Sequence, residues 1–202
     1  MSERARDLVA RSCIAVLFTL LSVNLLLNFL HTGHVTGLLL LASEGLVVVL
    51  TTIRRPARLV DRTVGAAVTT TLSMAGPPLL RATDALPLVP DALTAIVSAV
   101  GLALVIVGKM TLGRSFGLMP ANRGVVSSGV YRVVRHPIYL GYLITHLAFL
   151  LATPSAWNIA ALLAADAALL LRAVCEEQTL SRDSQYRAYQ QVVRWRVCPG
   201  LF

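Results

Sequence analysis

Residues 125–142 read VVSSGVYRVVRHPIYLGY and gather polar, aromatic and cationic side chains in a chain that is otherwise mostly apolar. Pro137 disfavours helical geometry at His136 and is itself suited to the first turn of a helix. We therefore predict that His136 lies at an extended corner before a helix N-terminus, where free backbone N–H groups can bind a carboxylate or a phosphate. From spacing alone, Tyr131, Tyr139 and Tyr142 fit an aromatic belt at a membrane interface equally well.

The composition places the chain among integral membrane proteins. Of its 202 residues 56% are hydrophobic and 14% are charged, well below the roughly 25% charged residues of soluble domains. The net charge of +8 comes from basic residues that lie between apolar runs, which indicates membrane topology and anionic lipid as a partner rather than nucleic acid. The three cysteines show no metal-ligand spacing, so no metal site is predicted.

Apolar runs of about 20 residues are the signature of transmembrane helices. With the N-terminus placed inside, only Arg81 of the 18 Lys and Arg residues falls outside, as the positive-inside rule requires. We predict an all-α, polytopic membrane protein with both termini cytoplasmic and a single domain, 1–202, in which 1–110 forms N-terminal helices and 111–202 forms the functional core. Six spans are expected, at 12–30, 35–53, 63–80, 92–110, 137–153 and 156–174, the last continuing as a polar helix through Leu180.

This topology brings the polar segments 111–136 and 172–202 to the same cytoplasmic face, where they can form a cofactor pocket. Within the second segment, Arg172 and Glu176 are four residues apart and share a helix face. An ion pair at the end of a span is the simplest interpretation. The neighbouring Glu177, and Tyr186 and Tyr189 one turn apart, favour a binding site instead.

Two carboxylates, Glu44 and Asp166, fall in the middle of expected spans. A charge there is costly, so each is either a functional residue or a protonated or paired carboxyl between helices. His146, one turn beyond Tyr142, either lines a tunnel or is a satisfied buried histidine. Asn24 and Asn28 are interpreted as side chains that form hydrogen bonds between helices. His31 and His34 are interpreted as solvated residues of a turn.

A set of spaced motifs carries a family resemblance. Ser128-Gly-Val-Tyr131 is followed by Arg135-His-Pro-x-Tyr-x-Gly141, Glu176-Glu-x-x-Leu180, Tyr186-x-x-Tyr189 and a late Pro199. In combination these motifs, spread over 112–202, resemble the isoprenylcysteine carboxyl methyltransferase family, which is related to the phospholipid methyltransferases. The resemblance implies a membrane-embedded methyltransferase that uses S-adenosyl-L-methionine without a Rossmann fold.

The resemblance also implies a site. Arg172 would be the catalytic, substrate-binding residue that holds a carboxylate. The implied substrate is a lipophilic or prenylated molecule, O-methylated on its carboxyl group as in an isoprenylcysteine, at the cytoplasmic face of a prokaryotic cell membrane. The cofactor contacts would be Arg123, Gly124, Val125, Val126, Tyr131, His136, Pro137, Ile138, Tyr139 and Glu176.

Other functions stay open at this point. An amine or thiol acceptor would need a base to remove its proton, which would give Glu177 or Asp166 a role. A reductase of the sterol type would bind NADPH, and four arginines in the region could hold its phosphates: Arg132, Arg135, Arg194 and Arg196. A non-enzymatic membrane scaffold would need neither Arg172 nor Glu176.

Overall fold

The computed structural model describes residues 35–81 and 86–202, together with isolated positions between 8 and 30. The expected span 12–30, apart from those positions, lies outside the described residues, and so do Asn24, Asn28, His31 and His34. The backbone of Glu44 belongs to a helix, but its side chain also lies outside the description.

The described part of the chain is mostly helical. The helices coincide closely with the apolar runs of the sequence, and the continuation of the last run through Leu180 is observed. The main helices are α2 (Val35–Ile53), α3 (Val64–Ala75), α4 (Asp91–Leu112), α5 (Pro137–Ala152), α6 (Ala156–Leu180) and α7 (Ser184–Val192). Short 3-10 turns and strands connect them: η1 (Pro77–Leu79), η2 (Gly113–Ser115), η3 (Gly129–Arg132), β1 (Leu59–Val60) and β2 (Ala121–Asn122).

One expected helix is shorter than its apolar run. The run 63–80 forms α3 only as far as Ala75 and then tightens into η1. Pro77 and Pro78 have no N–H to donate, so the α-helical hydrogen-bond ladder cannot continue through them. At the other end of α3, the Thr63 side chain caps the helix by accepting a hydrogen bond from the Ala66 N–H.

Two helices of the described part are long and apolar enough to cross a membrane. They are α6 and the continuous helical stretch Asp91–Ser115, which contains α4. Both expose large apolar side chains, including Ile96, Val100 and Leu163, each more than half exposed. Apolar stripes of this kind on an outer surface mark contact with lipid or with another apolar partner.

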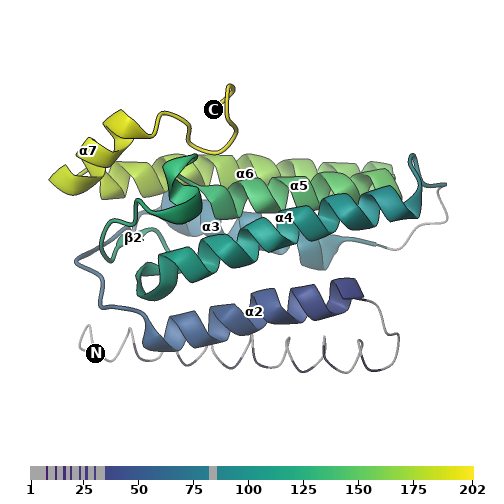
Figure 1. Ribbon diagram of the computed structural model, residues 1–202, viewed down its shortest axis with the longest axis horizontal. Coiled ribbons are helices and arrows are strands. Elements are labelled where there is room, and N and C mark those ends of the chain that lie inside the picture. Colours follow the sequence, from purple (N-terminus) through teal and green to yellow (C-terminus); the bar gives the residue numbers. More distant parts are fainter. Residues whose placement is uncertain are drawn as a thin grey trace.

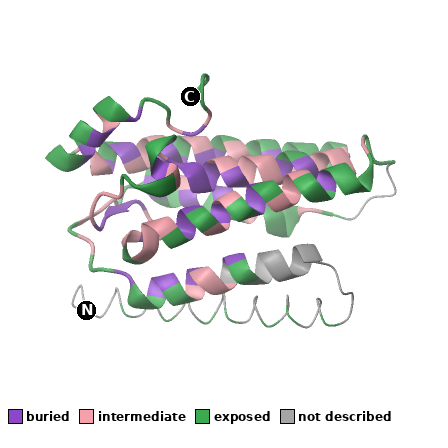
Figure 2. Cartoon of the chain, in the orientation of Figure 1, coloured by how far each residue is buried: buried purple, intermediate pink, exposed green. Residues whose placement is uncertain are grey.

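The bundle is built from two helix pairs whose backbones approach closely (Figure 1). In the α4–α5 pair, a Cβ added at Gly141 would lie 2.6 Å from the Gly101 carbonyl oxygen, and one added at Gly108 would meet Ile138. In the α3–α6 pair, Gly76 lies against Ala165. Small residues permit such contacts, as they do in membrane helix bundles. The buried residues lie mainly on the sides of the helices that face one another (Figure 2).

The polar segments gather at one end of the bundle, where β2 and α7 lie in Figure 1. There β1 pairs antiparallel with β2, and Val134 forms a parallel bridge with Trp195. Arg81 lies elsewhere, with its guanidinium 4.0 Å from the Trp157 ring centroid at the beginning of α6. The segments around residues 121–136 and 172–196 are therefore in direct contact.

The α4–α5 approach predicts the effect of one added methyl group. Gly141→Ala should destabilise the protein by about 1–3 kcal/mol, because its Cβ would be forced against the Gly101 carbonyl and Val105. The matched control is Gly45→Ala in α2, where nothing lies within 4 Å of the added Cβ. Its stability should be unchanged or higher, since alanine is the better helix former. Thermal unfolding in detergent measures both; equal stability of the two variants would contradict the packing argument.

Candidate functional site

A cavity of about 960 Å³ lies within the helix bundle and reaches the polar end. Ligand sites typically measure about 300–1,000 Å³, so this cavity is at the upper end of the range. Every site residue expected from the sequence lines it, with the exception of Pro137, which is buried at the first turn of α5. The lining residues of that expected set are Arg123, Gly124, Val125, Val126, Tyr131, His136, Ile138, Tyr139, Arg172 and Glu176.

One face of α5 forms a wall of the cavity. His136, Tyr139, Tyr142 and His146 recur at intervals of three or four residues and all line it, as one side of an α-helix does. His136 is non-helical, as expected before Pro137, but with φ −127° and ψ 63° it is not fully extended. Its imidazole stacks on the Tyr139 ring at a centroid distance of 5.1 Å.

The backbone at this corner offers fewer free N–H groups than the sequence indicated. The His136 N–H is donated to the Arg196 carbonyl at 2.7 Å, and the Tyr139 N–H to the His136 carbonyl at 3.1 Å. Both amides are therefore already used within the protein. The C-terminal segment thus uses the His136 N–H, which the sequence had indicated as free to bind an anion.

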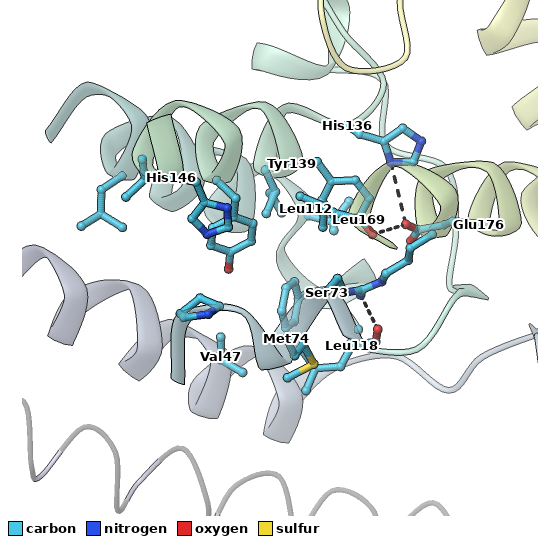
Figure 3. A pocket seen from close by; sticks show the side chains of 18 of the residues that line it. Val47, Ser73, Met74, Leu112, Leu118, His136, Tyr139, His146, Leu169 and Glu176 are labelled. Atoms are coloured by element: carbon cyan, nitrogen blue, oxygen red, sulfur yellow. Dashed lines mark hydrogen bonds and ion pairs between the residues drawn. The ribbon is translucent and has the colours of Figure 1, made fainter. Parts of the chain in front are cut away.

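Glu176 and Arg172 meet at Tyr139 rather than at each other. The Tyr139 hydroxyl donates to Glu176 Oε2 at 2.7 Å, and the Arg172 guanidinium carbon lies 5.4 Å from the Tyr139 ring centroid (Figure 3). Arg172 Nη2 donates to the Leu118 carbonyl, while its buried Nε has no hydrogen-bond partner among the described residues. A simple ion pair between Arg172 and Glu176 is thus not what the structure forms. Both side chains present charge to the cavity.

Glu177 has a different environment from its neighbour. It is 4% exposed and does not line the cavity. Its carboxylate pairs with Arg135 Nε at 2.7 Å and with Arg196 Nε at 2.8 Å, and His136 Nε2 lies at 3.4 Å. These contacts tie α6 to the beginning of α5 and to the C-terminal segment. Glu177 is therefore a positioning residue, and it does not reach a ligand as a base.

The same ion pairs involve arginines that a reductase of the sterol type would need to bind the phosphates of NADPH. Arg135 and Arg196, two of the four arginines that could have held NADPH phosphates, share the Glu177 carboxylate. The other two, Arg132 and Arg194, are exposed at the surface. Of these four arginines only Arg135 lines the cavity, where it is already paired with Glu177.

Three tyrosines close the polar end of the cavity. The Tyr189 hydroxyl donates to the Tyr131 carbonyl at 2.6 Å, and Tyr186 packs against Tyr189 with ring centroids 5.6 Å apart. Burial raises the pKa of Tyr131 and of Tyr186 well above the usual value, and it raises the pKa of Tyr189 to about 12. All three hydroxyls are therefore neutral at physiological pH and can donate hydrogen bonds.

The loop before η3 is held in place by side chains from both polar segments. Gly124 has a φ of +107°, a conformation that favours glycine. Its N–H donates to Asn122 Oδ1, and Asn122 Nδ2 donates to Asp183 Oδ2, both at 2.9 Å. Asp183 also caps α7, and the hydrogen bond from Asn122 lowers the pKa of its carboxyl group. The loop and α7 are thereby linked.

At the other end of the cavity His146 pairs with Asp166. His146 Nδ1 lies 2.6 Å from Asp166 Oδ1, which joins α5 to α6. His146 lines the cavity, but Asp166 does not. Both sequence interpretations of His146 therefore apply, since it is partnered and also lines the cavity. Asp166 has the paired, interhelical role and could affect a ligand only through His146.

Several contacts at the site have no local signal in the sequence. The partner of Arg172 is a backbone carbonyl, Leu118, 54 residues away. Asn122 and Asp183 are 61 residues apart. The sequence could predict that the two polar segments meet, but not which residues of the two segments pair.

The fold and the cavity together define a helical, membrane-type protein with an internal site that joins a polar end to an apolar interior. A family model described as isoprenylcysteine carboxyl methyltransferase (ICMT) family matches residues 92–182. Over this part of the chain the match confirms the resemblance found in the motifs. The matched range includes all the expected site residues and ends before α7. No curated protein matches the chain. The family supports a membrane-associated methyltransferase.

Removing Glu177 tests its positioning role. Glu177→Ala should destabilise the protein by about 3–5 kcal/mol, because it leaves the buried Arg135 without its counter-charge. The matched control is Gln178→Ala at the exposed neighbouring position on α6, which should change stability by less than about 0.5 kcal/mol. Thermal unfolding and proteolysis of residues 193–202 measure the two effects. Wild-type stability and an equally protected C-terminal segment in Glu177→Ala would contradict this role.

Proposed function

We propose that this protein transfers a methyl group from S-adenosyl-L-methionine to a lipophilic substrate, with carboxyl O-methylation of an isoprenylcysteine-like molecule as the favoured reaction. The observation that carries the proposal is one cavity with two kinds of wall. At its polar end lie His136, Tyr139 and Glu176, while Leu102 and Leu169 line the interior. Arg172 lies at Tyr139, where the two parts join.

The polar end suits the chemistry of this cofactor. S-adenosyl-L-methionine supplies, when bound, an electrophilic methyl group on a positively charged sulfur. Glu176 can accept hydrogen bonds from the cofactor's ammonium or ribose groups. Tyr139, which donates a hydrogen bond to Glu176, offers an aromatic face. The buried Tyr186 hydroxyl has no hydrogen-bond partner in the described structure. A bound molecule could satisfy such a group, whose isolation is otherwise costly.

Arg172 suits the acceptor. Its Nε is a buried donor with no hydrogen-bond partner on the wall of the cavity, and guanidinium groups bind carboxylates through two parallel hydrogen bonds. A carboxylate is already ionised at neutral pH, so no base is required, and the chain contributes mainly by orienting the acceptor. Attraction between the acceptor's negative charge and positive groups is strong in a dry cavity of low dielectric constant.

The location proposed for the site is the cytoplasmic face of a membrane crossed by six helices. Support comes from the distribution of charge: the basic segments around Arg58, Arg135 and Arg196 lie together at the polar end, whereas Arg81 packs on Trp157 at the first turn of α6. This asymmetry fits the positive-inside rule. The exposed apolar faces of α4 and α6 would contact lipid and leave a route for an apolar tail.

The first test is binding of the methyl donor. Calorimetry of the purified protein in detergent should give saturable binding of S-adenosyl-L-methionine. The affinity should be at least tenfold weaker in His136→Ala and in Glu176→Ala, which corresponds to a loss of about 1.4 kcal/mol or more of binding free energy. Gln178→Ala, exposed and two residues from Glu176, is the matched control and should bind normally. NADPH is titrated in parallel. Binding of NADPH, or of neither molecule by folded protein, would refute the methyltransferase assignment.

The second test concerns the acceptor. Arg172→Ala should weaken binding of a farnesylated cysteine derivative by roughly 10- to 150-fold, the equivalent of about 1.5–3 kcal/mol for charge-assisted hydrogen bonds. Its affinity for the methyl donor should remain within a few-fold of wild type. The control is Arg182→Ala, an exposed arginine at the end of α6.

The dependence of rate on pH separates the acceptor classes. With a carboxylate acceptor the methylation rate should be flat above pH 6, because the acceptor is already ionised. A rate that rises with pH through the acceptor's own pKa would indicate an amine or a thiol instead.

A further inference from the structure

The cavity extends well beyond the end at which methyl transfer is proposed. Figure 3 shows His146 at the opposite side of the cavity from His136 and Glu176. Tyr139 and His146 are seven residues apart on the same face of α5, which corresponds to about 10 Å at the α-helical rise of 1.5 Å per residue. The cavity wall contributed by α4 and α6 includes Leu102 and Leu169. An apolar chain held at Arg172 could therefore reach His146.

His146 presents one defined atom to this part of the cavity. It is 8% exposed, and its Nδ1 lies 2.6 Å from Asp166 Oδ1. When the Asp166 carboxylate accepts the Nδ1 proton, the neutral imidazole keeps its lone pair on Nε2. Nε2 has no hydrogen-bond partner among the described residues, and the side chain lines the cavity. Asp166 thus orients the ring and sets its tautomer.

Two hydroxyl groups at this end are also set as acceptors. Thr145 Oγ1 donates its proton to the Gly141 carbonyl, and Thr94 Oγ1 donates to the Asp91 carbonyl, both at 2.9 Å. Each hydroxyl has one proton, so the remaining lone pairs of both oxygens can only accept. Thr94 and Thr145 line the cavity together with His146. This end therefore offers several acceptors and needs a donor.

We propose that the His146 end of the cavity is a second binding subsite, which recognises a hydroxyl group on the otherwise apolar part of the substrate. The placement of the substrate rests on the proposed function, because Arg172 holds its carboxylate. A hydroxyl donates to Nε2 and can still accept a hydrogen bond itself. Among the lipophilic carboxylic acids of the proposed function, those that fit both ends carry a hydroxyl in the middle of the chain, because Tyr139, beside Arg172, and His146 are about 10 Å apart along α5.

The test uses stearic acid and a series of hydroxystearic acids in which the hydroxyl is moved stepwise along the chain. The purified protein is equilibrated in detergent with an equimolar mixture of stearic acid and one hydroxy acid, and the retained acids are quantified by mass spectrometry. The wild type should retain a mid-chain hydroxy acid roughly tenfold over stearic acid, the equivalent of about 1.4 kcal/mol. The preference should fall for a hydroxyl near either end of the chain. This comparison needs no variant.

Two variants assign the preference to His146. His146→Phe keeps an aromatic ring and removes both nitrogens, so its retention ratio should fall to about one. Phe149→Leu, at an apolar position of the cavity wall one turn further along α5, is the matched control. It should weaken retention of both acids equally and leave the ratio unchanged. Asp166→Asn removes the carboxylate that orients the ring and should reduce the ratio.

Three outcomes would overturn the subsite: a ratio near one for every hydroxyl position in the wild type, an unchanged ratio in His146→Phe, or retention of neither acid. The proposed function is judged separately, by calorimetry of the methyl donor on the same preparation. If the donor does not bind but the mid-chain preference persists and depends on His146, the proposed reaction fails and the subsite stands.

Discussion

The Glu177 carboxylate is the interaction on which the polar end of this protein depends. It is buried near the C-terminal end of α6 and pairs with Arg135 before α5 and with Arg196 near the C-terminus. A buried charge is tolerated only when it is paired and hydrogen-bonded, so the three segments must come together for any of them to be stable. The chain thereby places His136 and Glu176 on one cavity wall. The two adjacent carboxylates have different roles: Glu177 joins the three segments through ion pairs, and Glu176 lines the cavity.

The interior is shaped by a second constraint, the close approach of the helices within each pair. Gly101 and Gly141 bring α4 and α5 into backbone contact, and Gly76 does the same for α3 against α6. Tight packing within each pair leaves space within the bundle, and that space is the cavity. Its volume follows from where small side chains lie, so a methyl group added at a glycine would be expected to alter the site as well as the stability.

Helix α5 connects the two ends of the cavity. His136 at its N-terminus belongs to the proposed cofactor end, and His146 belongs to the apolar interior, paired with Asp166. The two histidines are held by carboxylates of α6 in both cases, because Glu176 and Glu177 lie beside the first and Asp166 beside the second. Carboxylates of α6 thus hold both histidines of this cavity wall, and the two histidines are separated along the length of α5.

The sequence by itself determined the helices, the non-helical corner at His136 and the resemblance to the methyltransferase family, because apolar periodicity, the proline geometry and spaced motifs are properties of the local chain. It also indicated that residues 111–136 and 172–202 share one end. Only the tertiary structure decided the partners. Arg172 meets a backbone carbonyl at Leu118, Arg196 takes the His136 N–H, and His146 finds Asp166. Such pairs depend on how rigid helices pack in three dimensions, and no local pattern in the chain encodes which side chains that packing brings within hydrogen-bonding distance.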